Sequence, residues 1–293
     1  MNLDKYLHDR SKLVDETLER LLPRESVKPV TIHRAMRYSI FAGGKRLRPI
    51  ACLAAAEACG GSLGRALPAA AAVECIHTYS LIHDDLPCMD DDDFRRGRPT
   101  SHKVFGEGIA VLAGDALLTE AFAILAQTKE TPRYSVRNFL AELALAAGSQ
   151  QLIAGQVADL EAEGKKSTRQ ELRFIHERKT AAMIISSLRL GAMSANATPA
   201  KLGALTVFGR SLGLAFQVID DILDITQTSE KLGKSAGKDL AAQKTTYPAV
   251  IGLPAARREA KRLTAEAHES LEPFGQDGAH LRALANYLLK REF

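Results

Sequence analysis

The chain has 293 residues, of which 46% are hydrophobic and 25% charged, and its formal net charge is +4. A chain of this length and apolar content can bury a sizeable core. The positive charge is mild, and no basic run is interleaved with aromatic residues, so nucleic-acid binding is not expected.

Alanine-rich and leucine-rich runs dominate the chain, and few segments alternate β-branched residues with a period of two. Because alanine and leucine favour helix, we predict an all-α protein. No shift in composition marks a domain boundary, so one large helical bundle is expected over residues 1–293. Helices are predicted at 3–21, 31–41, 48–59, 66–86, 106–126, 133–147, 149–162, 167–195, 199–225, 247–251, 255–271 and 278–290.

Targeting and redox features indicate a cytoplasmic protein. The four cysteines show no CxxC spacing and are interpreted as reduced thiols. The N-terminal sequence is charged and amphipathic, which is unlike a signal peptide. Glu74, Asp115 and Glu120 interrupt the apolar segments, so no membrane insertion is expected.

The first chemical motif is Gly44-Lys45-Arg46-Leu47-Arg48, followed by Pro49. Its glycines let the backbone approach an anion, and Lys45 and Arg48 can clamp a phosphate. A polar turn with solvated charges is the alternative interpretation.

The second motif is an acidic segment directly after an apolar helical stretch. It contains Asp84, Asp85 and Asp90–Asp93. The helix dipole is negative at that end, so these carboxylates need cations among them. Oxygen ligands favour Mg²⁺, with Mn²⁺ possible, and a solvated acidic loop is the alternative.

The spacing within this segment requires a break in the helix. Asp84 and Asp90 are six residues apart, which places them about 240° apart around an unbroken helix. Pro87 disfavours helix at Leu86 and lacks an amide hydrogen, so a break is predicted there.

Basic residues flank the acidic segment. His77 lies seven residues before Asp84 on the same helix face, and it either contacts phosphate or is a satisfied core residue. Arg95 and Arg96 follow the aspartates and can bind phosphate, neutralise the carboxylates, or do both.

A second acidic cluster lies on another apolar helix. Asp220 and Asp224 are four residues apart and share a face, with Asp221 and Gln217 close in sequence. Two facing acidic helices would form a cage for metal ions whose other ligands are substrate phosphates.

Three weaker features lie near this cluster. Gln156 and Asp159 share a helix face, and Lys179 and Thr180 lead into a buried run. Lys234 and Lys244 stand in a loop that could close over diphosphate. Ordinary solvated faces and a surface loop are the alternatives.

Together these motifs resemble the trans-isoprenyl diphosphate synthases, the short-chain prenyltransferases. The resemblance extends from Gly44 to Pro248 and includes both aspartate-rich motifs, the Arg-Arg-Gly segment and the Lys-Thr pair, in the family's order. The segment Leu81–Asp90 is similar to bacterial farnesyl and geranylgeranyl diphosphate synthases.

The resemblance implies an isoprenoid synthase fold with a deep central cavity, usually as a homodimer. It implies three Mg²⁺ ions, held by Asp84, Asp90 and Asp220 and supported by Asp85, Asp221 and Asp224. Arg95, Lys179, Lys234 and Lys244 would bind the allylic diphosphate. Gly44, Lys45, Arg48, His77 and Arg96 would bind isopentenyl diphosphate, and Thr180 and Gln217 would lie near the reacting carbons.

The implied reaction condenses isopentenyl diphosphate with dimethylallyl or geranyl diphosphate. Tyr79 and Ser80 precede Asp84 by one turn, and an aromatic residue at this position is similar to farnesyl synthases. We therefore predict farnesyl diphosphate, with geranylgeranyl diphosphate as the alternative, because segment 101–107 resembles the twenty-carbon enzymes. Rival interpretations are a class I terpene cyclase, which Lys45 and Arg48 oppose, a regulatory subunit, and a structural Mg²⁺-binding protein.

Overall fold

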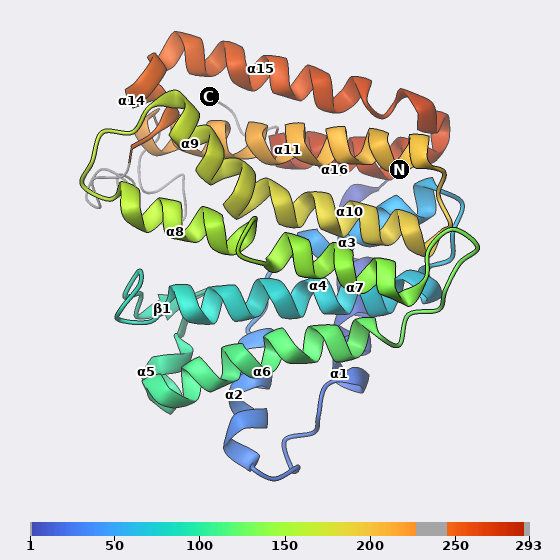
Figure 1. The fold of residues 1–293 in the computed structure, drawn as a ribbon, viewed down its shortest axis with the longest axis vertical. Helices are drawn as coiled ribbons and strands as arrows, with labels where there is room; N and C mark the ends of the chain where they lie inside the picture. The colour runs from blue at the N-terminus through green and yellow to red at the C-terminus, as the bar shows by residue number, and fades with distance from the viewer. Residues whose placement is uncertain (1, 227–244, 290–293) are drawn as a thin grey trace. The chain divides into compact units, whose positions relative to one another are not determined.

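The computed structural model describes residues 2–226 and 245–289, and its regular structure is helical apart from one short hairpin (Figure 1). This confirms the predicted all-α class. The chain forms two compact units, residues 1–141 with 190–196, and residues 142–189 with 197–293. Two of the divisions fall within α7 (Val136–Ala147) and α10 (Ala182–Ser194), and the third follows α10. One domain over residues 1–293 stays a prediction.

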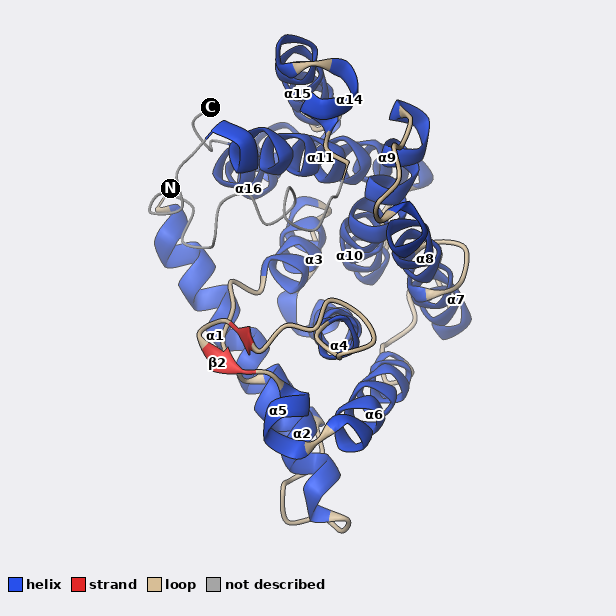
Figure 2. Cartoon of the chain, turned by 90° about the vertical axis from the view of Figure 1, so that its left-hand side faces the viewer, coloured by secondary structure: helices blue, strands red, loops and turns tan. Residues whose placement is uncertain are grey.

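The first unit is built around α4, which packs against α3 and α6 (Figure 2). The buried run Ala69–Ala72 has small side chains, so neighbouring helices can approach α4 closely. The elements of this unit are α1 (Leu3–Leu21), α2 (Val30–Ile40), α3 (Leu47–Ala58), α4 (Leu63–Asp84), β1 (Phe94–Arg95), β2 (Arg98–Pro99), α5 (Ser101–Phe105) and α6 (Glu107–Leu125).

The ends of α4 differ slightly from those predicted. The helix begins three residues earlier than expected, with Ser62 as an extended N-cap whose side chain makes no capping hydrogen bond. It ends at Asp84, two residues before Leu86, because Pro87 cannot continue the amide ladder.

The hairpin of β1 and β2 was not predicted. Phe94 pairs with Pro99 and Arg95 with Arg98, and the two turn residues, Arg96 and Gly97, both have positive φ. Two such residues form the tight turn that suits an antiparallel pair. Strands of two residues show no alternation, so the sequence pattern could not reveal them.

The second unit is organised on α11, against which α15 packs lengthwise (Figure 1). Its elements beyond α7 are α8 (Leu152–Ala162), α9 (Arg169–His176), a π-helix (Glu177–Ala181), most of α10, α11 (Pro199–Thr226), α14 (Tyr247–Ile251), α15 (Leu253–Glu269), a 3₁₀ helix (Glu272–Gly278) and α16 (Ala279–Leu289). The helix predicted over 167–195 is confirmed as an unbroken helical run from Arg169 to Ser194, but the sequence did not predict the π-helical turn within it.

Two helices, α6 and α11, are long and apolar enough to cross a membrane by length and composition alone. Each packs against a neighbouring helix, α4 for α6 and α15 for α11, as core helices also do. The absence of membrane insertion therefore stays a prediction.

Candidate active site

The first acidic segment folds back at the end of α4. The Asp90 amide donates a hydrogen bond to the Asp84 carbonyl at 2.8 Å, and the Asp91 amide donates to the Leu86 carbonyl at 3.2 Å. The helix has already ended at Asp84. The predicted break is therefore confirmed, and the turn returns the backbone of Asp90 to the helix end.

Arg95 is engaged by the aspartates of this segment. Its Nε atom donates to Oδ1 of the buried Asp85 at 2.6 Å, its Nη2 atom lies 2.5 Å from the same oxygen, and Nη2 donates to Asp92 at 3.4 Å. Of the two predicted roles for Arg95, neutralisation of the aspartates is the one that this geometry supports directly. Binding of the allylic diphosphate by Arg95 stays a prediction.

Predicted isopentenyl-diphosphate residues lie beside this segment. Arg48 Nη1 lies 3.3 Å from His77 Nε2. Burial lowers the pKa of His77 well below its ordinary value, and the nearby Arg48 and Arg96 lower it further. His77 is therefore neutral near pH 7, and its Nε2 accepts from Arg48 rather than repelling it.

The glycine loop receives the Arg96 side chain. Arg96 donates to the Gly43 carbonyl, and a Cβ on Gly44 would lie 2.4 Å from the guanidinium carbon. Gly44 also has φ +119, a backbone conformation that other residues rarely adopt. The structure thus brings Gly44 and Arg96 together, whereas Lys45 is exposed.

Arg46 holds this loop from inside, a role that the sequence did not reveal. Its buried guanidinium contacts Glu74 at 2.7 Å and Asp15 at 2.8 Å, and it donates to the Ile40 carbonyl. The isolated motif gives no sign that Arg46 points inward while Lys45 points outward. The signal available was Glu74, an acid within an otherwise apolar helix, which needs a buried cation.

The second unit contains a cavity of about 210 Å³ beside α11. Five predicted site residues line it, namely Lys179, Thr180, Gln217, Asp220 and Asp221. Lys179 Nζ lies 2.7 Å from Asp159, and the Thr180 hydroxyl donates to Gln217 Oε1 at 2.9 Å. The cavity therefore presents a cation, carboxylates and two oriented polar side chains.

Lys179 and Thr180 lie on the π-helix, which two glycines accommodate. A Cβ on Gly155 of α8 would lie 2.2 Å from the Lys179 amide nitrogen, and one on Gly213 of α11 would lie 2.7 Å from the Ala181 Cα. Such single π turns inside α-helices are frequent at functional sites. The sequence offered only the glycines as a signal.

Asp221 and Asp224 of α11 are more deeply buried than Asp220. Asp221 Oδ2 accepts from the Tyr247 amide at 2.8 Å. Asp224 is 7% exposed, and its Oδ2 atom has no hydrogen-bond partner among the described residues. A buried carboxylate oxygen of this kind favours a nearby cation.

His176 also lines the cavity and was not among the predicted site residues. It is buried, its ring packs against Tyr247, and burial lowers its pKa to about 4. Its position three residues before Lys179 in the sequence was the available signal.

Other predicted residues are placed less decisively. Tyr79 is buried on α4 and packs edge-on against His83, with ring centres 5.7 Å apart, and Ser80 donates to the His77 carbonyl. Tyr79 as the floor of a substrate pocket stays a prediction. Lys234 and Lys244 lie outside the described residues.

Carboxylate groups with arginine or lysine beside them suit an enzyme that binds diphosphates together with divalent ions. The chain belongs to the polyprenyl synthetase family, which matches residues 29–281, and it is a trans-prenyltransferase.

Relatives over the whole chain agree with this assignment. The large subunit 1 of a heterodimeric geranylgeranyl pyrophosphate synthase from Arabidopsis thaliana is 50% identical, covering 98% of this chain and 79% of that protein. A geranylgeranyl diphosphate synthase from Cyanophora paradoxa is 46% identical, with 99% and 97% covered. A solved FPP/GFPP synthase from Zymomonas mobilis has a TM-score of 0.87 at 34% identity, with 98% and 99% covered.

Proposed function

We propose that this trans-prenyltransferase condenses isopentenyl diphosphate with allylic diphosphates, and that its main product is geranylgeranyl diphosphate. The observation that carries the condensation is the cavity in which Lys179, Asp220 and the Thr180–Gln217 hydrogen bond lie together. Such a site can bind a diphosphate and orient dipoles toward a developing carbocation.

Mg²⁺ fits the carboxylates present. The first cluster offers Asp84 and Asp90, and α11 offers Asp220, with Asp85, Asp221 and Asp224 in support. All of these groups offer oxygen ligands, and the Oδ2 atom of Asp224, which has no partner in the described part of the chain, is consistent with a cation nearby. Bound Mg²⁺ would draw charge from the departing diphosphate. Three ions per site, and Mn²⁺ as a substitute, are parts of the proposal.

The proposed substrate-binding residues form two groups, one for each diphosphate. We assign Lys179 and Arg95 to the allylic diphosphate, whose carbon–oxygen bond breaks when charge is drawn from the leaving group. Gly44, Lys45, Arg48, His77 and Arg96 are assigned to isopentenyl diphosphate, whose double bond attacks the cation. The pyrophosphate that leaves takes up the proton. Lys234 and Lys244 would complete the allylic site.

Oligomeric state is a further part of the proposal. The Arabidopsis relative is named as a subunit of a heterodimer. We propose a homodimer for this chain, active without a second gene product. Light scattering on the purified chain, with turnover measured on the same sample, tests it, because a monomer that turns over would overturn it.

Product length rests on two opposing observations. Several relatives at 46–50% identity are named geranylgeranyl diphosphate synthases, which favours twenty carbons over the farnesyl product predicted from the sequence. Tyr79, large and buried one turn before Asp84, favours fifteen carbons and keeps farnesyl diphosphate as a second candidate.

The test is chromatography of dephosphorylated products made from radiolabelled isopentenyl diphosphate with each allylic starter. We expect products of mainly twenty carbons. Products of mainly fifteen carbons would favour the second candidate, and no condensation would refute the proposed reaction.

Tyr79→Ala should lengthen the product by roughly one five-carbon unit if Tyr79 is the pocket floor. Tyr79→Phe keeps the ring and should leave length unchanged. Unchanged length in Tyr79→Ala would place the floor elsewhere.

A further inference from the structure

A buried histidine lies next to aspartates that the proposed reaction does not use. His102 of α5 is only 6% exposed. Its Nδ1 atom lies 3.2 Å from the Thr100 hydroxyl oxygen, and that hydroxyl donates its own proton to the Asp92 carbonyl at 2.9 Å. The hydroxyl oxygen must therefore accept from Nδ1–H, which leaves a lone pair on Nε2.

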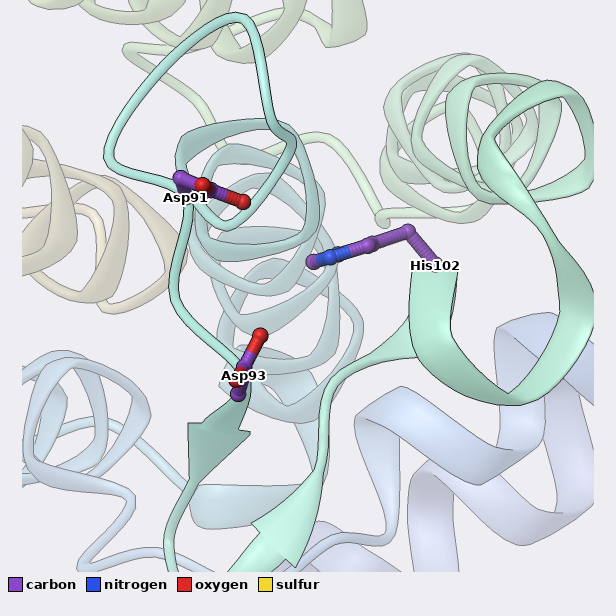
Figure 3. A group of neighbouring side chains, drawn as sticks. All are labelled: Asp91, Asp93 and His102. Atoms are coloured by element: carbon purple, nitrogen blue, oxygen red, sulfur yellow. The ribbon is translucent and has the colours of Figure 1, made fainter.

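Within residues 2–226 and 245–289, that lone pair has no protein donor. His102 Nε2 is buried and lacks a hydrogen-bond partner among the described residues. Ligand atoms from His102, Asp91 and Asp93 all lie within 4.8 Å of one another. Figure 3 shows the imidazole extending from α5 toward the two aspartates, which come from the turn after α4. An imidazole nitrogen this close to two carboxylate oxygens offers a set of metal ligands.

We propose that Asp91, Asp93 and His102 form a site for a divalent transition-metal ion. The imidazole nitrogen separates this site from the carboxylates assigned to Mg²⁺, because nitrogen ligands favour ions such as Zn²⁺ and Co²⁺ over Mg²⁺. The Thr100 hydroxyl holds the imidazole by its other nitrogen, which is how metal-binding histidines are usually oriented. Both aspartates are exposed, so water can fill the remaining coordination positions.

Lys103 is the cation that an ion would have to displace. Its Nζ lies 2.7 Å from Asp93, and its side chain is 45% exposed, so it can swing into solvent. Removing this lysine leaves the two carboxylates without their competing charge. The proposal therefore predicts that a neutral residue at position 103 tightens metal binding.

The ion would join two segments that are separate in sequence. Asp91 and Asp93 lie on the turn that follows Asp90, whereas His102 lies on α5. An ion held by both would tie the turn to α5 and raise the unfolding temperature, by an amount that grows with the logarithm of the metal concentration above Kd.

The test uses Co²⁺ as the probe, added to the full chain without diphosphate and with excess Mg²⁺ to occupy carboxylate sites. Coordination through Nε2 leaves the Nδ1 proton in place, so a paramagnetically shifted, exchangeable imidazole proton should appear in the NMR spectrum. His102→Gln should abolish this signal. Asp91→Asn and Asp93→Asn should each weaken Co²⁺ binding roughly 10- to 100-fold, and Lys103→Met should strengthen it.

Two control variants distinguish this site from other histidines and from the proposed Mg²⁺ ligands. His8→Gln removes an exposed histidine, and Asp84→Asn removes a proposed Mg²⁺ ligand; both should keep the shifted signal. If His102→Gln does not fold, the double variant Asp91→Asn/Asp93→Asn decides by its affinity. Bound Co²⁺ without the shifted proton, unchanged affinity in the double variant, or no binding in both wild type and Lys103→Met would overturn the proposal.

Discussion

The acidic clusters of the two units carry the same residue type but are held in different ways. In the first unit the aspartates lie on a turn beyond the end of α4, where Asp90 bonds back to Asp84 and Asp91 has φ 49°. In the second unit Asp220 and Asp224 lie within the continuous helix α11, and Lys179, which lines the same cavity as Asp220, lies on a π-helix.

The difference shows where each cluster is vulnerable. The turn depends on backbone hydrogen bonds and on residues that accept left-handed conformations, so its geometry is local in sequence. The helix cluster depends on how closely α8 and α11 approach the π-helix, so its geometry is determined by packing.

Loss of one carboxylate from either cluster should reduce turnover most. Asp84→Ala and Asp220→Ala should each lower kcat by about 10²–10³, because each removes stabilisation of the leaving group's charge. Melting without ligand should change little or rise, since the acids repel each other. Asp4→Ala, on the exposed first turn of α1, is the control. Wild-type turnover in either variant would refute the metal assignment of that cluster.

The same variants test whether the clusters serve one step. The double variant Asp84→Ala/Asp220→Ala should lose much less than the product of the two single losses, since residues that act as a unit are non-additive. Multiplied losses would indicate that the clusters act in separate steps.

The buried histidines make stability depend on pH. Burial lowers the pKa of His176 to about 4, below its ordinary 6.5, so the unfolded chain binds the extra proton between these values. The contribution of neutral His176 to the free energy of unfolding, about 3 kcal/mol, is present at pH 7 and is lost as pH falls from 6.5 toward 4. Urea unfolding at pH 7 and pH 4.5 measures it.

His77 is a buried histidine of the first unit, and its pKa is also lowered. In the wild type, both histidines therefore contribute to the fall in unfolding free energy at low pH. In His176→Gln, only the contribution of His77 in the first unit should remain. The fall in unfolding free energy from pH 7 to 4.5 should be smaller in the variant. An equal fall in both proteins would contradict the neutral, buried state of His176.

Loss of single cations should separate the substrates. Lys179→Ala, in the second unit, should raise KM for the allylic diphosphate, and Arg48→Ala, in the first, should raise KM for isopentenyl diphosphate. Each loses charged hydrogen bonds of about 1.5–3 kcal/mol, or roughly tenfold to hundredfold. Lys45→Ala should resemble Arg48→Ala, and the exposed Lys12→Ala should change neither constant. Equal effects on both substrates would overturn the assignment.

Glycine substitutions in α11 test the packing of the second cluster with the smallest expected effect. A Cβ on Gly213 meets Ala181 of the π-helix, whereas one on Gly203 of the same helix meets nothing within 4 Å. Gly213→Ala should cost about 1–3 kcal/mol of unfolding free energy and reduce turnover. Gly203→Ala should gain up to about 1 kcal/mol by helix propensity alone. Equal stability in the two variants would show that the close approach is unimportant.

The sequence by itself determined the features that depend on neighbouring residues. Helix positions followed from composition, and the shared face of Asp220 and Asp224 followed from their spacing. The break after α4 followed from Pro87, because a missing amide and a restricted preceding residue act within one turn. The family also followed from the motifs and their order.

Tertiary structure decided the features for which distant segments supply the partner. Arg46 is inward because Glu74 and Asp15 meet it, and the π-helix at Lys179 exists where Gly155 and Gly213 leave room. Likewise, the imidazole of His102 is buried among residues of the turn and α5, which the spacing of its motif does not show. A charge or a polar atom is stable inside a protein only beside a suitable partner, and folding, not local sequence, brings that partner near.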